Sequence, residues 1–132
     1  MTKMKDYYRI LSLNNDATTA QIKKRTLELG KQLHPSSKEP EVIDESKDFV
    51  DVVEAFEVLY EVKSRKIYDR LLNSKTQSPS HHKFENYIHM ISQRGRKSGE
   101  KYAKSKFKVF KNDLKEFRWG DITRILEGII PW

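Results

Sequence analysis

The strongest constraint on this chain is the spacing of its apolar residues on either side of Pro35. Core-type residues recur mostly every three or four positions, at Ile22, Thr26, Leu29 and Leu33 and then at Phe49, Val52, Val53, Phe56 and Leu59. This period is that of an α-helix, and it predicts helices over residues 19–33 and 41–61. Pro35 separates the two, because the residue before a proline is disfavoured in helical geometry. We therefore expect two helices joined by a loop.

Shorter helical patterns flank this pair. Asp6 is a suitable N-cap for a helix over residues 7–12, and Thr18 with Gln21 has the spacing of a capping box. A further short pattern follows the pair, at Ile67, Tyr68, Leu71 and Leu72. No alternating strand pattern is convincing, so the sequence predicts an all-α protein.

The composition excludes several classes of protein. Of the 132 residues, 36% are hydrophobic and 34% charged, which suits a modest core and is too polar for an integral membrane protein. No cysteine is present, so we expect neither disulfides nor a thiolate zinc site. Residues 1–20 are too polar for a secretory signal, which favours a cytoplasmic location.

The net charge of +7 lies entirely in the second half of the chain. Residues 1–72 hold 13 basic and 13 acidic residues, whereas residues 73–132 hold 13 basic and 6 acidic residues. Within residues 93–118 an aromatic and aliphatic stripe recurs at helical spacing, at Phe107, Phe110, Leu114 and Phe117. This pattern predicts a basic amphipathic helix, preceded by a short helix at "FENYIHMI". The segment "NSKTQSPSHHK" between the halves is typical of a linker.

Four uses of the basic helix remain open. It folds back on the first half, binds another protein, lies on an anionic membrane surface, or binds nucleic acid. Folding back has a specific motive, because residues 39–61 contain nine acidic residues and one basic residue, Lys47. Nucleic-acid binding has the weakest support, because no known motif accompanies the charge.

Three stretches of the first half resemble the J domain of DnaJ-type co-chaperones: "DYYRILSLNNDATTAQIKK", "LHP" and "FVDVVEAFEVLYEVKSRKIYDRL". The resemblance covers residues 6–72 and implies two long antiparallel helices flanked by short ones. It suggests a J-like domain over residues 1–72, a linker over 73–83 and a basic helical C-terminal extension over 84–132. The fold class is thus a J-domain-like helical hairpin plus a basic amphipathic helix.

In that family, the His-Pro-Asp loop and the basic face of the preceding helix contact a DnaK-class chaperone. Carried over by position, the residues implied to bind this partner are Lys23, Lys24, Lys31, His34, Pro35 and Ser36. Ser36 stands where the family carries an acid, so we expect an adaptor that binds the chaperone weakly or not at all. The resemblance implies no enzyme, cofactor or metal. His81, His82 and His89 are interpreted as solvated. The alternative is a peripheral membrane or nucleic-acid binding module that uses the J fold as a scaffold.

Other positions also depart from the family pattern. Ser12 stands where a glycine often ends the first helix, and Val62 replaces a common proline, which predicts that the last two helices of the J-like part run closer to continuous. On the contact helix, an aromatic and basic residues are replaced by Thr26, Leu27 and Glu28.

Overall fold

The protein is helical throughout the part that the structure, a computed structural model, describes: residues 4–34, 45–73 and 81–115. Its elements are α1 (Tyr7–Ile10), α2 (Thr19–Leu33), α3 (Glu45–Tyr60), α4 (Val62–Asn73), α5 (His81–Lys104) and a further helix over residues 107–115. These ranges contain no strand, and the prediction of an all-α fold is confirmed.

Helix α2 begins and ends where its local sequence dictates. The hydroxyl of Thr18 accepts from the backbone N–H of Gln21, and the side chain of Gln21 accepts from the backbone N–H of Thr18. This capping box satisfies two donors that have no partner within the helix. The predicted range of residues 19–33 is confirmed.

Helix α1 is shorter than predicted and ends in a left-handed turn. The N–H of Leu13 bonds to the carbonyl of Tyr8 at 2.8 Å, and the N–H of Ser12 bonds to that of Arg9 at 2.9 Å. These two bonds form a Schellman motif, which places Ser12 at φ 54°. A side chain is strained in this conformation, which glycine adopts freely.

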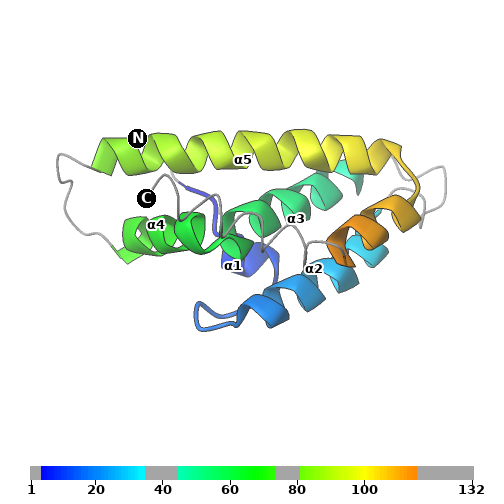
Figure 1. Ribbon diagram of the computed structural model, residues 1–132, viewed down its shortest axis with the longest axis horizontal. Coiled ribbons are helices and arrows are strands. Elements are labelled where there is room, and N and C mark those ends of the chain that lie inside the picture. The colour runs from blue at the N-terminus through cyan, green and yellow to red at the C-terminus, as the bar shows by residue number, and fades with distance from the viewer. Residues whose placement is uncertain (1–3, 35–44, 74–80, 116–132) are drawn as a thin grey trace.

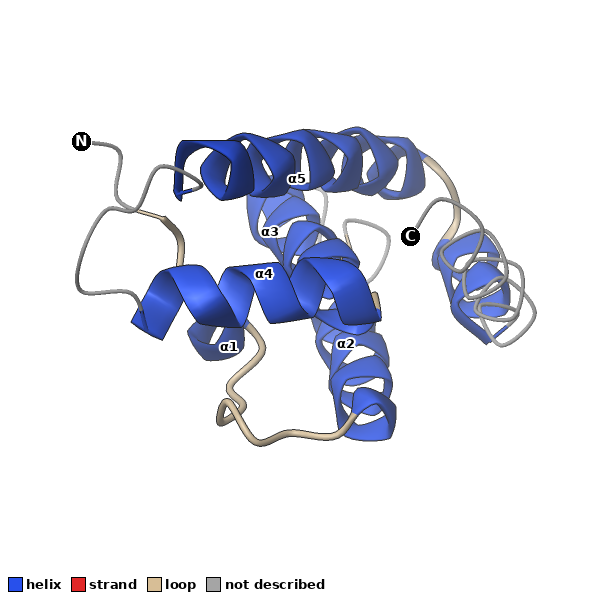
Figure 2. Ribbon diagram, turned by 60° about the vertical axis from the view of Figure 1, so that its left-hand side comes forward, coloured by secondary structure: helices blue, strands red, loops and turns tan. Residues whose placement is uncertain are grey.

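Helix α3 is the centre of the molecule. It contacts α1, α2, α4 and α5, and Figures 1 and 2 show it enclosed between α5 on one side and α2 on the other. Seven of the nine core-type residues given by the helical spacing are buried, and Tyr68 is buried with them: Ile22, Thr26, Phe49, Val52, Val53, Phe56 and Leu59. Leu29 and Leu33 are only half-buried, and Leu72 is exposed.

Helices α3 and α4 are nearly continuous, with Glu61 alone between them. The hydroxyl of Ser64 donates to the carbonyl of Val58 at 2.6 Å, so a side chain satisfies a group at the end of α3. Val62 begins α4 and is 58% exposed. This agrees with the expectation drawn from the absence of a proline.

Helix α5 corrects two predictions. It begins at His81, inside the predicted linker, and continues to Lys104, so "FENYIHMI" and the first part of residues 93–118 form one helix. The chain then bends at residues 105–106 before the helix over 107–115. The buried face of α5 consists largely of small residues and isoleucines, at Ile88, Ile91, Ser92, Gly95 and Gly99. Because three of these five residues are small, a sequence pattern of large apolar residues does not predict this helix face.

Two glycines let α5 lie close against α3. A Cβ atom on Gly95 would lie 2.9 Å from the Cα of Glu54, and one on Gly99 would lie 3.0 Å from the Cα of Val50. Such distances leave no room for a side chain at either position. Of the four uses left open for the second half, the structure shows folding back onto the third helix.

Two arginines of α5, together with Lys5, pair with the acids of α3. Arg96 lies 2.7 Å from Glu54 and 2.9 Å from Asp51, while Arg94 lies 3.5 Å from Glu57 and 3.3 Å from Glu61, the residue that follows α3. The lysines in the described part of the second half are exposed to solvent. Among the described helices, none combines the length and apolar composition needed to cross a bilayer.

Candidate functional site

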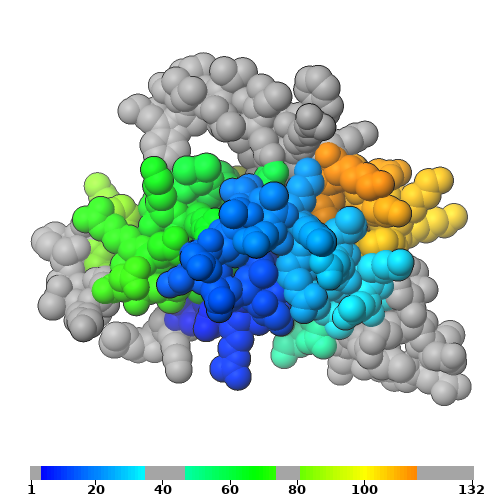
Figure 3. Space-filling model, turned by 90° about the horizontal axis from the view of Figure 1, so that it is seen from below, coloured from blue at the N-terminus to red at the C-terminus, as the bar shows by residue number. Residues whose placement is uncertain are grey.

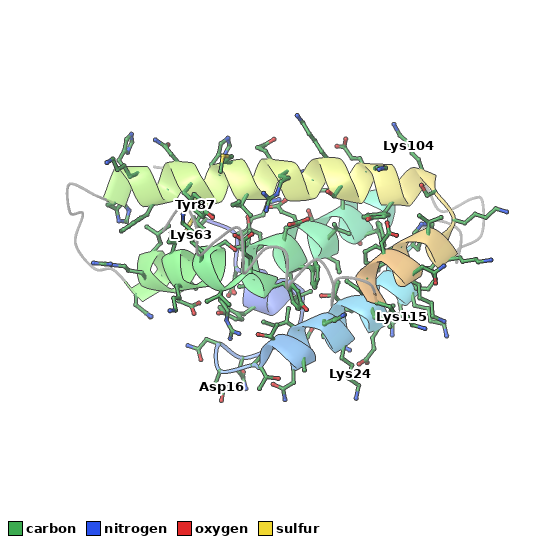
Figure 4. The ribbon with its side chains drawn as sticks, in the orientation of Figure 1. Asp16, Lys24, Lys63, Tyr87, Lys104 and Lys115 are labelled. Atoms are coloured by element: carbon green, nitrogen blue, oxygen red, sulfur yellow. The ribbon has the colours of Figure 1, made fainter. Side chains whose placement is uncertain are left out.

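The candidate site is the α2 face, which we define as Lys23, Lys24, Lys31 and His34. Lys24 and Lys31 are exposed, and Figure 4 shows Lys24 pointing away from the body of the protein. Lys23 is half-buried, and its Nζ donates to the backbone carbonyl of Lys115 at 3.4 Å. The structure thus keeps two of these lysines accessible. Pro35 and Ser36, the remaining predicted site residues, lie outside the described residues.

His34 is buried, with 1% of its surface exposed. Its Nε2 lies 2.8 Å from the backbone carbonyl oxygen of Tyr102, in the last turn of α5. The edge of the ring packs against Phe49 at 4.9 Å and against Phe107 at 5.8 Å between centroids. The histidine predicted to meet a partner is therefore enclosed by the second half of the same chain.

The helix over residues 107–115 lies along α2. A Cβ atom on Gly30 would lie 2.7 Å from Cε2 of Phe110, so the phenyl ring occupies the space that a side chain at Gly30 would need. Phe110 also packs against Phe49 at 5.1 Å, and Leu114 is 1% exposed. In Figure 3 this helix lies directly beside α2. Two of the four predicted stripe residues are thus buried, Phe107 is half-buried, and Phe117 lies outside the described residues.

Tyr102 connects the end of α5 to the next helix. Its hydroxyl donates to the Asp113 carboxylate at 2.7 Å, and its ring packs against Phe110 at 5.3 Å. Burial, together with the neighbouring Asp113 carboxylate, raises the pKa of Tyr102. The backbone carbonyl of Tyr102 also accepts from His34, so Tyr102 contacts both the end of α2 and the helix over residues 107–115.

A second polar cluster lies beneath α1 and is structural. The Glu54 carboxylate is buried and accepts from the hydroxyl of Tyr7, from Nζ of Lys5 at 3.0 Å and from Arg96 at 2.7 Å. Burial and the Glu54 carboxylate raise the pKa of Tyr7. These contacts tie the start of the chain and α5 to the buried Glu54 of α3.

Two further tyrosines hold α1 against α4. The Tyr8 hydroxyl donates to Asp69 and accepts from Arg65 at 3.1 Å, while the Tyr68 hydroxyl donates to the Lys5 carbonyl at 2.6 Å. Burial is the main cause that raises the pKa of both Tyr8 and Tyr68 to about 12. These contacts fix the start of the chain to the core.

A lysine surface covers the end of α5 and the following helix. We define it as Lys97, Lys101, Lys104, Lys106, Lys108, Lys111 and Lys115, all of which are exposed. None of them forms an ion pair within the described part of the chain. Figure 4 shows Lys104 directed into solvent. Over the same ranges, no cluster of three or more histidine or carboxylate side chains is arranged to hold a metal ion.

Sequence reasoning missed the contact of Tyr102 with His34 on the α2 face, and the pairing of Arg96 with the acids of α3. One signal was available for the contact at Gly30. A glycine inside a helix costs about 1 kcal/mol relative to alanine, and it is often explained by a close approach of another segment. Here that segment carries Phe110, 80 positions later in the sequence.

Comparison with known proteins gives one family and no structure. The family described as DnaJ domain matches residues 6–69. The Chaperone protein DnaJ of Hydrogenobacter thermophilus is 39% identical over 85 residues, which cover 64% of this chain and 23% of the relative. The Curved DNA-binding protein of Coxiella burnetii (strain Dugway 5J108-111) is 43% identical over 67 residues, which cover 50% of this chain and 20% of the relative. The Chaperone protein DnaJ of Protochlamydia amoebophila is 43% identical over 67 residues, which cover 51% of this chain and 17% of the relative.

The chain therefore spans about a fifth of the length of these curated relatives. No solved structure matches it.

Proposed function

We propose, from the premise that residues 6–69 belong to the DnaJ domain family, that this chain is a J-domain adaptor that engages a DnaK-class chaperone weakly or not at all. The family consists of co-chaperones and not of enzymes, and its J domains typically partner with DnaK-class chaperones. The accessible lysines of α2 support an acidic partner, because they leave a positive surface on the helix that precedes His34.

The observation that carries the proposal is Ser36. A chaperone cation that meets an acid in other members meets a neutral hydroxyl here, and leaving a buried charge unpaired costs about 2–5 kcal/mol. A cost of about 1.4 kcal/mol lowers the affinity about tenfold, so the expected loss of affinity is roughly thirty-fold to several thousand-fold. Glu28 is exposed on α2 and adds negative charge to a helix whose partner is expected to be acidic.

The test is stimulation of a DnaK ATPase by the full chain. We expect little stimulation by the natural sequence and a clear increase with Ser36→Asp. The matched control is Lys24→Glu in the Ser36→Asp background, because Lys24 is exposed and its reversal leaves the core intact. Strong stimulation by the natural sequence, abolished by Lys24→Glu, would contradict the proposed weakness. No stimulation by any variant would contradict chaperone binding.

The lysine surface favours a second candidate function, peripheral binding to an anionic membrane with the J fold as scaffold. Each lysine near such a surface contributes about 1 kcal/mol, and the effect decreases with salt. Vesicles containing phosphatidylserine should then sediment the chain at low salt but not at high salt, and Lys104→Gln with Lys108→Gln should weaken the association. Binding to a DNA duplex without binding to vesicles would favour a nucleic-acid partner instead.

A further inference from the structure

We infer that residues 102–115 form a removable cap over the α2 face, and that His34 reaches an external partner only when this cap lifts. The cap consists of the last turn of α5, the bend and the following helix. The identity of the external partner rests on the proposed function, whereas the existence of the cap does not.

The first support is the hydrogen bond that His34 makes. The carbonyl of Tyr102 can only accept, so Nε2 of His34 carries the proton and donates to it at 2.8 Å. The last carbonyls of a helix lack partners within the helix, and a donor at that end stabilises it. The same carbonyl accepts from the N–H of Ser105 at 3.1 Å. His34 thus acts in this chain as a C-terminal capping donor for α5.

The second support is the enclosure of the ring. Phe49 contacts it from α3 and Phe107 contacts it from the cap, and the residue is 1% exposed. A chaperone that reads His34 from outside would find no accessible ring atom. Moving the end of α5 and Phe107 away from α2 is the direct route to exposing it.

The third support is that the cap helix is short and carries the same sign of charge as the helix it covers. The helix over residues 107–115 is too short to be stable alone, because isolated helices below about 12 residues are marginal in water. Phe110 in the space above Gly30, with the buried Leu114, holds it against the rest of the protein. Lys108, Lys111 and Lys115 lie on this helix, and the facing helix α2 is itself basic. Like charges on both sides oppose closure.

The direct test is the accessibility of the histidines in the full chain. Diethylpyrocarbonate acylates an accessible imidazole, and mass spectrometry then gives the rate for each residue. His82 and His89 are exposed and serve as references within the same molecule. We expect His34 to react at least tenfold more slowly than either. Equal rates for the three residues would overturn the inference.

Two variants should release the cap. Phe110→Ala removes the ring that packs against Gly30, and Gly30→Ala places a methyl group 2.7 Å from that ring without deleting any core atom. Both should accelerate acylation of His34 several-fold and leave His82 unchanged, with the melting transition showing that the domain remains folded. In the Phe110→Ala background, Gly30→Ala should add nothing, because the two changes act on one contact. If both variants stay folded and His34 stays protected, the inference is wrong.

Chaperone binding is then measured in the Ser36→Asp background, with and without Phe110→Ala. Several-fold tighter binding of the double variant would support control of the site by the cap. If the cap is released but binding to DnaK does not change, control by the cap is wrong while the proposed function stands. If neither variant binds DnaK, the proposed function fails, and the acylation rates still decide whether the cap exists.

Discussion

Replacing Arg96 by methionine should destabilise the protein far more than its surface position suggests. The Arg96 guanidinium contacts Glu54 at 2.7 Å and Asp51 at 2.9 Å, and the side chain of Glu54 is only 3% exposed. Methionine retains the apolar stem of the arginine, so the change removes mainly the charge. What remains beside the buried carboxylate is the Tyr7 hydroxyl and Lys5, which is 46% exposed.

The magnitude follows from the burial of Glu54. Removing one partner of a buried ion pair costs about 3–5 kcal/mol, because the other charge stays desolvated. Since Lys5 and Tyr7 still contact the carboxylate, we expect a loss of about 2–3 kcal/mol. Arg94 is the matched control, two residues earlier on the same helix. It is 49% exposed and lies 3.3 Å from the partly exposed Glu61, and its contact with the buried Glu57 is longer, at 3.5 Å, than either contact of Arg96, so Arg94→Met should cost about 1 kcal/mol, less than Arg96→Met.

Urea denaturation followed by circular dichroism measures both losses. Arg96→Met should lower the midpoint clearly at unchanged slope, and Arg94→Met should lower it less. Equal effects of the two substitutions would refute this prediction, because the burial of Glu54 would then add nothing to the cost of losing its arginine. The natural chain and both variants should be compared at two salt concentrations, since screening weakens the exposed pair more than the buried one.

Three further predictions concern backbone and tyrosine groups. Gly95→Ala should lower the melting temperature, although alanine favours helix by about 1 kcal/mol, because a Cβ atom 2.9 Å from the Cα of Glu54 forces α5 outward; a higher melting temperature would contradict this close packing. Ser12→Gly should raise the free energy of unfolding by about 0.5–1 kcal/mol, since it relieves a positive φ of 54°, and an unchanged urea midpoint would count against that. The pKa of Tyr8 and that of Tyr68 are raised to about 12 from 10.0, so both hydroxyls ionise at lower pH in the unfolded chain than in the folded protein. The stability that is present below pH 10 should therefore fall by about 1.4 kcal/mol per pH unit for each tyrosine as the pH approaches 12. Tyr8→Phe should make that fall less steep in thermal melts recorded from pH 8 to pH 12, and an unchanged slope would contradict it.

Local chemistry made the first half of the fold predictable. The capping box at Thr18 and the helical spacing that follows specify α2 with signals that lie within a few residues of each other. The core positions of α3 follow from the same spacing. The upper bound of α1 was less predictable, because Ser12 adopts a left-handed conformation that its side chain does not favour.

The second half was predicted in outline only, for a physical reason. The motive for folding back was electrostatic, but exposed lysines gain little from pairing with acids on a surface. The buried face of α5 instead includes Gly95 and Gly99, which allow α5 and α3 to approach closely. Small residues carry no hydrophobic signal, so a pattern of large apolar residues places the helix boundary too late.

The candidate site shows the same limit in a different form. The sequence indicates His34 through its neighbour Pro35, but its burial depends on Tyr102, 68 positions away. Lys23 likewise meets the carbonyl of Lys115, 92 positions away. Neither contact has a local signal, so the sequence identifies the residues of the α2 face and not their accessibility.

Ser36 and the cap weaken the same contact by different means, and their effects should multiply. The missing acid lowers the affinity of every open molecule, whereas the cap lowers the fraction of molecules that are open. If closure is favoured by about 1.4 kcal/mol, roughly one molecule in ten is open, and the apparent affinity falls about tenfold. Ser36→Asp raises only the affinity of the open molecules, and Phe110→Ala raises only the fraction of molecules that are open. Because one change alters the partner contact and the other alters a contact within the chain, their free energies should add. A double variant that binds DnaK no better than Ser36→Asp alone would show that His34 is already accessible in the closed form.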